Sequence, residues 1–247
     1  RLLVESLDEA FAESMNPDEV KDAVESKLFG IGSEAFVVGS HEFYLAYAIS
    51  RNTLVCFDLG HFHPTELVAD KLSAALQFLP ELLLHISRPM RWDSDHVVLL
   101  SDEVRILGEE LVRSGRIDDV YLGLDFFDAS INRIGAWAVG SRSTLKALLA
   151  AYLQPHETLL EYERSGNNFA RMALLEELKT MPLGAVWDHY CRSEEAPTDR
   201  ELIETVTNRY GGAIPCVLVT ADDDLELREA ALAAGAIDYL PKKAIRE

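Results

Sequence analysis

The sequence predicts an α/β protein that forms part of a (β/α)8 barrel of the TIM type, with about four βα units. Short β-prone runs alternate with helical segments, which is typical of a parallel sheet covered by helices, and each predicted strand ends in polar residues. We expect strands around residues 23–29, 54–58, 82–87 and 120–126, and helices at residues 41–51, 64–78, 102–113 and 130–153. Four such units make half of an eight-stranded barrel.

The C-terminal part of the sequence predicts a helical extension followed by a short tail. Leucines recur at helical spacing between residues 145 and 153 and again between residues 174 and 178, which indicates helices outside the sheet or between subunits. Tyr210, Gly211 and Gly212 form the clearest linker. We therefore expect one region over residues 1–210 and a β-α-β tail over residues 211–247.

The composition narrows the possible partners and the compartment. The 42 acidic residues outnumber the 23 basic ones, which disfavours nucleic acid and anionic membranes but suits divalent cations and neutral substrates. Cys56, Cys191 and Cys216 are widely separated, which argues against a disulfide framework and for a reducing compartment, the cytoplasm. We expect no membrane span and no signal peptide. The start at Arg1 within an amphipathic pattern suggests a piece of a longer chain.

The first two predicted strands end in residues that could bind metal or substrate. Strand alternation places Glu25 and Lys27 on one face, at the end where a barrel builds its site. A surface salt bridge is the alternative interpretation of that pair. The next strand ends in Asp58, and His61 follows through a glycine-containing turn. An Asp and a His this close could each give a ligand to a metal pair, although their spacing alone is a weak signal.

The third and fourth strands repeat the pattern. His85 ends the third strand, Asp93 and Asp95 follow in the loop, and Asp125 ends the fourth strand. The two loop carboxylates could clamp a cation, or they could belong to a solvated turn. Acidic residues gathered at corresponding strand ends would be costly to bury without compensation, so the sequence predicts bound divalent cations.

Carboxylate and imidazole ligands without thiolate indicate Mn²⁺, Mg²⁺, Co²⁺ or Zn²⁺ rather than an iron-sulfur centre. Among these, Mn²⁺ is our preferred ion. For His63 and His96 we favour roles in supporting the ligands or in packing. Structural roles are expected for His41, His156 and His189.

Five segments of the sequence together resemble the L-rhamnose isomerase family, over about residues 1–210. They are residues 22–32, 37–44, 58–66, 84–96 and 123–133. The resemblance implies a structural metal held by Glu25, Asp58, His85 and Asp125, and a catalytic metal held by His61, Asp93 and Asp95. It also implies that the ammonium of Lys27 lies near the substrate oxygen at carbon 1.

Two departures from that family stand out. The resemblance covers the second half of the family's barrel and its C-terminal helices, so the apolar pocket residues that recognise the methyl end of the sugar have no counterpart here. The tail resembles the end of a response-regulator receiver domain, with Thr220 and Lys242 at the positions of its threonine and lysine. Lys243 stands where that family usually has proline, and the phosphoacceptor aspartate has no match. A β-α-β element that pairs with an open sheet edge is the alternative.

We therefore expect an aldose-ketose isomerase that interconverts L-rhamnose and L-rhamnulose with two divalent cations. The expected catalytic residues are Lys27, His61, Asp93, Asp95 and Asp125. A small-molecule sugar is the expected partner, and the family resemblance implies a homo-oligomer, a tetramer, if the barrel is completed. The alternatives are a non-catalytic metal-binding fragment or chimera of that enzyme, and a metal-dependent hydrolase on the same barrel type. A phospho-signalling module is disfavoured because the acceptor aspartate has no match.

Overall fold

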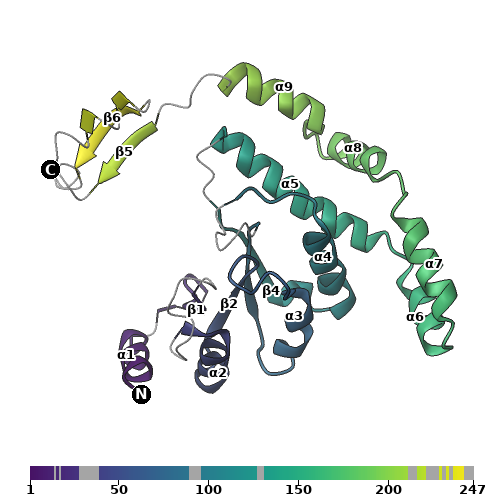
Figure 1. Cartoon of the computed structure of the whole chain (residues 1–247), viewed down its shortest axis with the longest axis horizontal. Coiled ribbons are helices and arrows are strands. Elements are labelled where there is room, and N and C mark those ends of the chain that lie inside the picture. The colour runs from purple at the N-terminus through teal and green to yellow at the C-terminus, as the bar shows by residue number, and fades with distance from the viewer. Residues whose placement is uncertain are drawn as a thin grey trace.

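The computed structural model confirms the α/β architecture with four parallel strands. It describes residues 1–13, 15–16, 18–27, 39–88, 96–126, 131–210, 216–220, 228–229, 232–233 and 236–241. The sheet contains β1 (Ala23–Glu25), β2 (Leu54–Asp58), β3 (Leu82–Ile86) and β4 (Val120–Leu124), hydrogen-bonded in that order. The strands alternate with α2 (His41–Arg51), α3 (Ala69–Ala75), α4 (Asp102–Ser114) and α5 (Arg133–Tyr152), as Figure 1 shows. This arrangement is consistent with a partial TIM-type barrel.

Local signals set the ends of the helices. Helix α2 has the predicted bounds because the Ser40 hydroxyl accepts a hydrogen bond from the Phe43 backbone N–H at 3.2 Å, which caps the first turn. Asn52 ends the helix in the left-handed region, at φ 52°. Helix α3 begins at Ala69, later than predicted. The preceding residues form turns instead, and the Glu66 N–H donates to the His63 carbonyl at 2.8 Å.

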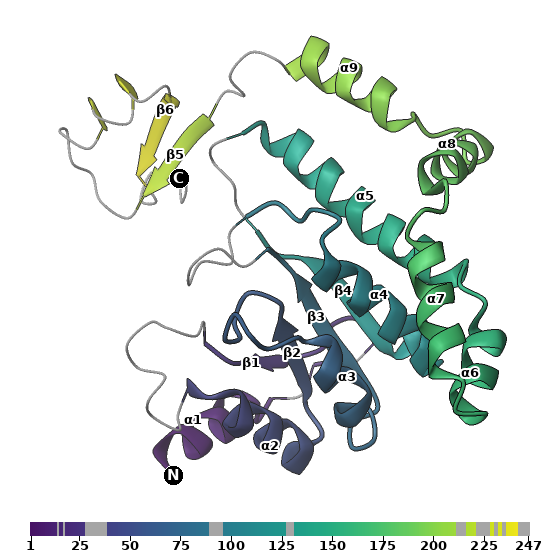
Figure 2. The ribbon, with the colours of Figure 1, turned by 45° about the vertical axis from the view of Figure 1, so that its right-hand side comes forward.

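Helices pack against one face of the sheet (Figure 2). The hydrophobic core lies between that face and the helices that follow each strand. Leu82, Leu84 and Ile86 alternate along β3 and are at most 1% exposed. The helices α2, α3 and α4 contribute buried residues to the same core. Because side chains alternate along a strand, residues such as His85 face the other side of the sheet. The core therefore leaves that opposite face free for polar side chains.

The C-terminal extension consists of helices attached to α5. Its elements are α6 (His156–Arg164), α7 (Asn168–Leu178), α8 (Leu183–Ser193) and α9 (Asp199–Tyr210). Asp199 accepts hydrogen bonds from Arg142 at 2.9 Å and from the Trp187 indole at 3.1 Å, and it pairs with Lys146. One carboxylate thus joins α9 and α8 to α5. None of the helices in the described ranges is long and apolar enough to cross a membrane.

The two ends of the chain add smaller elements. Helix α1 (Leu2–Ala10) contacts α2 through Asp8, which accepts hydrogen bonds from Tyr47 at 3.0 Å and from Arg51 at 2.8 Å. Strands β5 (Cys216–Thr220) and β6 (Ala236–Pro241) form a separate parallel pair. Residues 228–229 and 232–233 between them have helical backbone, and the β-α-β tail stays a prediction. Gly211, Gly212 and Lys242 lie outside the described residues.

Helices α4 and α5 cross closely at Gly108, and this contact gives a first prediction. A Cβ at Gly108 would lie 3.0 Å from the backbone C and O atoms of Ala147. Gly108→Val should therefore lower the free energy of unfolding by roughly 1–3 kcal/mol, the usual cost of overpacking. Urea denaturation checks this against Gly184→Val, because an added Cβ at Gly184 meets nothing within 4 Å. Equal stability of the two variants would contradict the close crossing.

Candidate metal centre

The parallel sheet brings four predicted ligands to its carboxyl end. Glu25 and Asp58 are the last residues of β1 and β2, and Asp58 pairs in register with His85 on β3. Asp125 follows β4, and its backbone N–H donates to the Ile86 carbonyl at 3.4 Å. Because all four strands run in the same direction, their ends meet at one edge of the sheet. The spacing in the sequence therefore becomes a cluster in space.

His85 lies at the centre of this cluster. Its Nδ1 atom lies 3.0 Å from Glu25 Oε1, 3.2 Å from Asp125 Oδ2 and 3.8 Å from Asp58 Oδ2. The hydrogen bond to Glu25 raises the pKa of His85, burial opposes this, and the three carboxylates add to the rise. For Glu25, burial raises the pKa but the His85 hydrogen bond and the nearby imidazoles lower it further, so the net shift is downward. An imidazolium can thus balance part of the negative charge when no cation is bound.

Asp58 carries a buried oxygen atom without a hydrogen-bond partner. The residue is 0% exposed. Its Oδ1 atom accepts hydrogen bonds from the Gly60 N–H at 2.6 Å and the Ser87 hydroxyl at 2.8 Å. Its Oδ2 atom has no hydrogen-bond partner among the described residues. Burial raises the pKa of Asp58, although His61 and these hydrogen bonds oppose the shift. A buried, unpaired carboxylate oxygen is costly, and a divalent cation fits it.

His61 is oriented by a backbone carbonyl. Its Nδ1 atom lies 2.8 Å from the Ser26 carbonyl oxygen, which can only accept, so we assign the proton to Nδ1. The Nε2 atom then keeps its lone pair and lies 4.0 Å from Asp58 Oδ2. Ligating histidines in metal sites are commonly held in this way.

The described residues form two overlapping sets of three carboxylate or imidazole ligands, called the hard-ligand sets below because they contain no sulfur. Glu25, Asp58 and His61 make one set, and Asp58, His85 and Asp125 make the other, with ligand atoms within 4.8 Å of one another in each. The structure thus brings together five of the seven predicted ligands. Asp93 and Asp95 lie outside the described residues. Carboxylate and imidazole donors fit Mn²⁺, Mg²⁺, Co²⁺ or Zn²⁺.

Gly39 leaves room for the side chain of Lys27, and the sequence analysis missed this contact. The Lys27 backbone N–H donates to the Gly39 carbonyl at 3.3 Å. A Cβ at Gly39 would lie 2.5 Å from Lys27 Cδ and even closer to Cε. The lysine stem therefore occupies the space that a side chain at residue 39 would need. No spacing signal in the sequence could have identified this contact.

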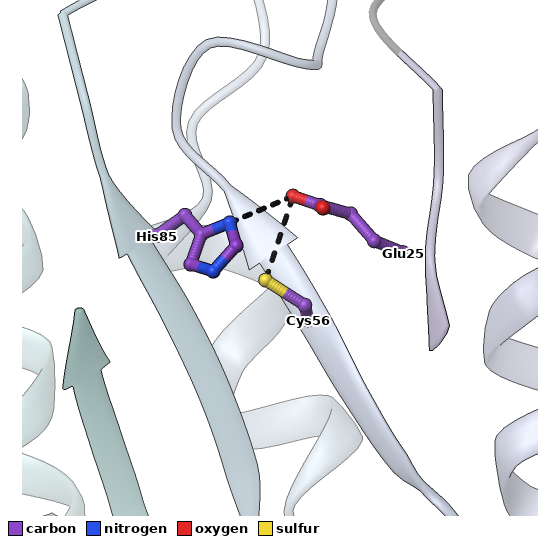
Figure 3. Close-up of side chains that lie close together, drawn as sticks. All are labelled: Glu25, Cys56 and His85. Carbon is purple, nitrogen blue, oxygen red and sulfur yellow. Dashed lines mark hydrogen bonds and ion pairs between the residues drawn. The ribbon is translucent and has the colours of Figure 1, made fainter. Parts of the chain in front are cut away.

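Cys56 is a second residue that the sequence analysis missed as part of the site. Its thiol donates to Glu25 Oε1 at 3.5 Å (Figure 3). Burial raises the pKa of the thiol, and the Glu25 carboxylate adds to the rise. Cys56 precedes Asp58 by two residues, so strand alternation places both on the same face. The two-residue spacing of Cys56 and Asp58 was therefore a signal in the sequence that could have assigned Cys56 to the site.

The remaining described histidines lie in other surroundings. The His41 ring packs edge to face on Phe57 and Phe62, each with ring centroids 4.9 Å apart, and burial lowers its pKa. The His156 Nε2 atom lies 2.8 Å from the Ala151 carbonyl oxygen. Both arrangements agree with the structural roles expected for these two residues. His63 contacts Thr65 through a 2.6 Å hydrogen bond.

Comparison with known proteins decides the family. The family model described as L-rhamnose isomerase (RhaA) matches residues 1–214. The chain belongs to the L-rhamnose isomerase family. Curated L-rhamnose isomerases from Rhodopirellula baltica, Citrobacter koseri and Escherichia coli strain SE11 are each 56% identical to it over 204 residues, or 83% of the chain. The same alignments cover 48% of the first relative and 49% of the other two. The chain thus spans about half the length of the curated relatives it matches.

The charge balance around His85 predicts how the metal-free protein responds to pH. The pKa of His85 is raised from 6.5 in the folded state, so its stabilising contribution is complete below pH 6.5 and is lost as the pH rises through the folded value. The raised pKa of Asp58 also makes the stability fall as the pH rises, and this effect begins above the ordinary pKa of 3.8. Glu25 acts oppositely, but only as the pH falls below 4.5. With a chelator present, the melting temperature should therefore fall as the pH rises from about 6.5 through the folded pKa of His85.

Differential scanning calorimetry in the presence and absence of Mn²⁺ checks this expectation. Bound cation should weaken or reverse the trend, because protons compete with cations for the same ligands. A melting temperature of the chelated protein that rises over this range would contradict the electrostatic account of the site.

Proposed function

We propose that this chain carries the two-cation centre of an aldose-ketose isomerase that interconverts L-rhamnose and L-rhamnulose. One observation carries the proposal. In a chain of the L-rhamnose isomerase family, the carboxyl end of the sheet brings together four side chains: Glu25, Asp58, His85 and Asp125. The unpaired Asp58 Oδ2 atom supports the presence of a cation. The curated relatives are named L-rhamnose isomerase, and the sugar is taken from that name.

The ligands divide into two groups in this proposal. Glu25, Asp58, His85 and Asp125 hold a structural ion, and His61, Asp93 and Asp95 hold a catalytic ion. Mn²⁺ is the preferred ion, with Zn²⁺, Co²⁺ or Mg²⁺ as alternatives, because oxygen and imidazole donors suit these metals. The Ser26 carbonyl lies 2.8 Å from His61 Nδ1, which leaves the Nε2 atom as the proposed metal ligand.

The chemistry expected of the site moves hydrogen between carbons 1 and 2 of the open-chain sugar. A bound divalent cation supplies Lewis acidity, which polarises the sugar's carbonyl group. Lys27 presents an ammonium group that stabilises the negative charge developing on the oxygen at carbon 1. Gly39 leaves space for the lysine stem. Ser87 and Gly60 keep Asp58 oriented through its Oδ1 atom.

The remaining parts of the barrel wall are proposed to come from further strands. Strand β4 is an edge of the described sheet, and its residues Tyr121, Leu122 and Leu124 are 37–40% exposed. Edge strands with apolar surface need a covering partner. We propose that the completed barrel forms a homo-oligomer, a tetramer as in the family, in the cytoplasm, with a small sugar as its substrate and neither nucleic acid nor membrane as a partner.

A non-catalytic metal-binding fragment or chimera is the second candidate, because the chain covers about half of its relatives. The chimera hypothesis concerns the C-terminal tail. The family match ends at residue 214, and β5 and β6 pair in parallel beyond it. We propose residues 211–247 as a receiver-like β-α-β element without phosphotransfer activity, distinct from residues 1–210.

The isomerase assay separates these candidates. We expect the 247-residue chain alone to show very weak turnover of L-rhamnose with Mn²⁺, and the N-terminal half of a curated relative, added as a second polypeptide, to restore activity if the two dock. Metal binding without turnover in either preparation would favour the fragment. Full turnover by the chain alone would show that the described half of the wall suffices.

Lys27 variants test the proposed role of the ammonium in that restored activity. Lys27→Ala should lower kcat about 100-fold or more, as for other donors that stabilise a developing oxyanion. Gly39→Ala should lower it about 10- to 100-fold by displacing the lysine stem. In the double variant Lys27→Ala/Gly39→Ala, the substitution of Gly39 should lower kcat no further. Gly184→Ala, which meets no neighbour within 4 Å, is the matched control. Additive effects of the two substitutions would contradict a role of Gly39 through Lys27.

The two proposed ion sites should respond differently to loss of a ligand. Glu25→Gln should remove the structural ion and lower the melting temperature of the Mn²⁺-loaded protein by about 5–10 °C, since metal-linked stability is lost. Asp93→Asn and Asp95→Asn should weaken the catalytic ion while largely preserving the melting temperature. Metal content and calorimetry, measured together, check this. Equal thermal losses in all three variants would contradict the division of roles.

A further inference from the structure

We propose that Glu25, Cys56 and His85 form a coordination set for soft divalent cations, with Cd²⁺ as the probe ion, distinct from the hard-ligand sets described above. The inference rests on the proposed function only in that Glu25 and His85 are also ligands of the hard-ion centre. What it adds is a thiolate ligand from Cys56 and a second class of ion.

The geometry of three neighbouring strands carries the proposal. Glu25 on β1 pairs in register with Cys56 on β2, and His85 lies on β3 beside them. Glu25 Oε1 lies 3.5 Å from Cys56 Sγ and 3.0 Å from His85 Nδ1. The three ligand atoms all lie within 4.8 Å of one another. Figure 3 shows the carboxylate, thiol and imidazole pointing toward one another. One ion can therefore reach all three with small side-chain shifts.

The surroundings of Cys56 favour metal binding over other thiol chemistry. The residue is 2% exposed, so bulky oxidants and alkylating reagents reach it poorly. Cys191, the other cysteine whose burial the structure describes, lies on α8 beside Arg142. It therefore offers Cys56 no disulfide partner. A buried thiol beside a carboxylate and an imidazole has the mixed ligand types of a soft-metal site.

Ligand softness separates the two classes of ion at this position. A hard ion gains little from sulfur, so Cys56 keeps its proton and continues to donate to Glu25. A soft ion gains a strong bond to thiolate. The S–H bond breaks, its proton passes to the solvent buffer and a sulfur–metal bond forms, with no change of oxidation state. Thiolate and carboxylate together balance the double positive charge, which limits the cost of burying the ion.

Competition between hard and soft ions follows from the shared ligands. Glu25 and His85 belong to the soft set and also to the hard-ligand sets that include Asp58. A soft ion that draws both side chains toward Cys56 removes them from the hard ion. Cd²⁺ should therefore displace Mn²⁺ from this position.

Cadmium titration of the full chain tests the proposal. Cd²⁺ should produce the ultraviolet charge-transfer band of a cadmium–thiolate bond, at one sulfur per ion. The Cys191→Ser/Cys216→Ser variant, which retains Cys56 as its single cysteine, should keep the band, and Cys56→Ser should lose it. A band that persists in Cys56→Ser, or that is missing from the Cys191→Ser/Cys216→Ser variant, would overturn the inference.

A second measurement covers the case in which Cys56→Ser fails to fold. Alkylation of Cys56 in the unsubstituted chain, followed by mass spectrometry under mild denaturant, should slow more with Cd²⁺ than with Mn²⁺ when the two ions are compared at concentrations that stabilise the fold equally. Equal alkylation rates with and without Cd²⁺ would overturn the proposal. A cadmium–thiolate band without any Mn²⁺ binding would refute the hard-ion centre and leave this inference standing. Mn²⁺ binding without Cd²⁺ capture at Cys56 would support the hard-ion centre and overturn this inference.

Discussion

The burial of the Asp58 carboxylate is the constraint to which the rest of the site is adjusted. A carboxylate that is fully removed from water is expensive unless its oxygens are paired. Ser87 and the Gly60 backbone pair one oxygen, and the imidazoles of His61 and His85 approach the other. The apolar core on the opposite face of the sheet holds β2 and β3 in register, so these partners remain where the charge requires them.

The fold could be predicted from the sequence wherever local signals decide it. Helix α2 has the predicted bounds because its cap and its end are encoded by Ser40 and Asn52. The start of α3 was predicted too early, since turn hydrogen bonds before Ala69 compete with the helix and leave little trace in the pattern. Strand β4 ends one residue before Asp125, so this ligand lies just beyond the sheet rather than in it.

The candidate site was predictable in its ligands but not in its contacts. Residues at corresponding strand ends converge in any parallel sheet, and Glu25, Asp58, His85 and Asp125 do so here. The contact between Gly39 and the Lys27 stem depends on the path of the chain between them, which no periodicity encodes. The sequence analysis used Cys56 only as evidence on the redox compartment. The spacing of the cysteines does not reveal that Glu25 on β1 and His85 on β3 lie beside Cys56.

The single available oxygen of Asp58 has a thermodynamic consequence for ion loading. Asp58 belongs to both hard-ligand sets, yet its Oδ1 atom is already occupied by Gly60 and Ser87. In the proposed division Asp58 holds the structural ion, while His61, whose Nε2 atom lies 4.0 Å from Asp58 Oδ2, holds the catalytic ion. Two ions bound this near one carboxylate would have coupled affinities, and by reciprocity each would change the binding of the other by the same factor. Occupancy measured with one ion alone would then misstate the affinity of the loaded pair.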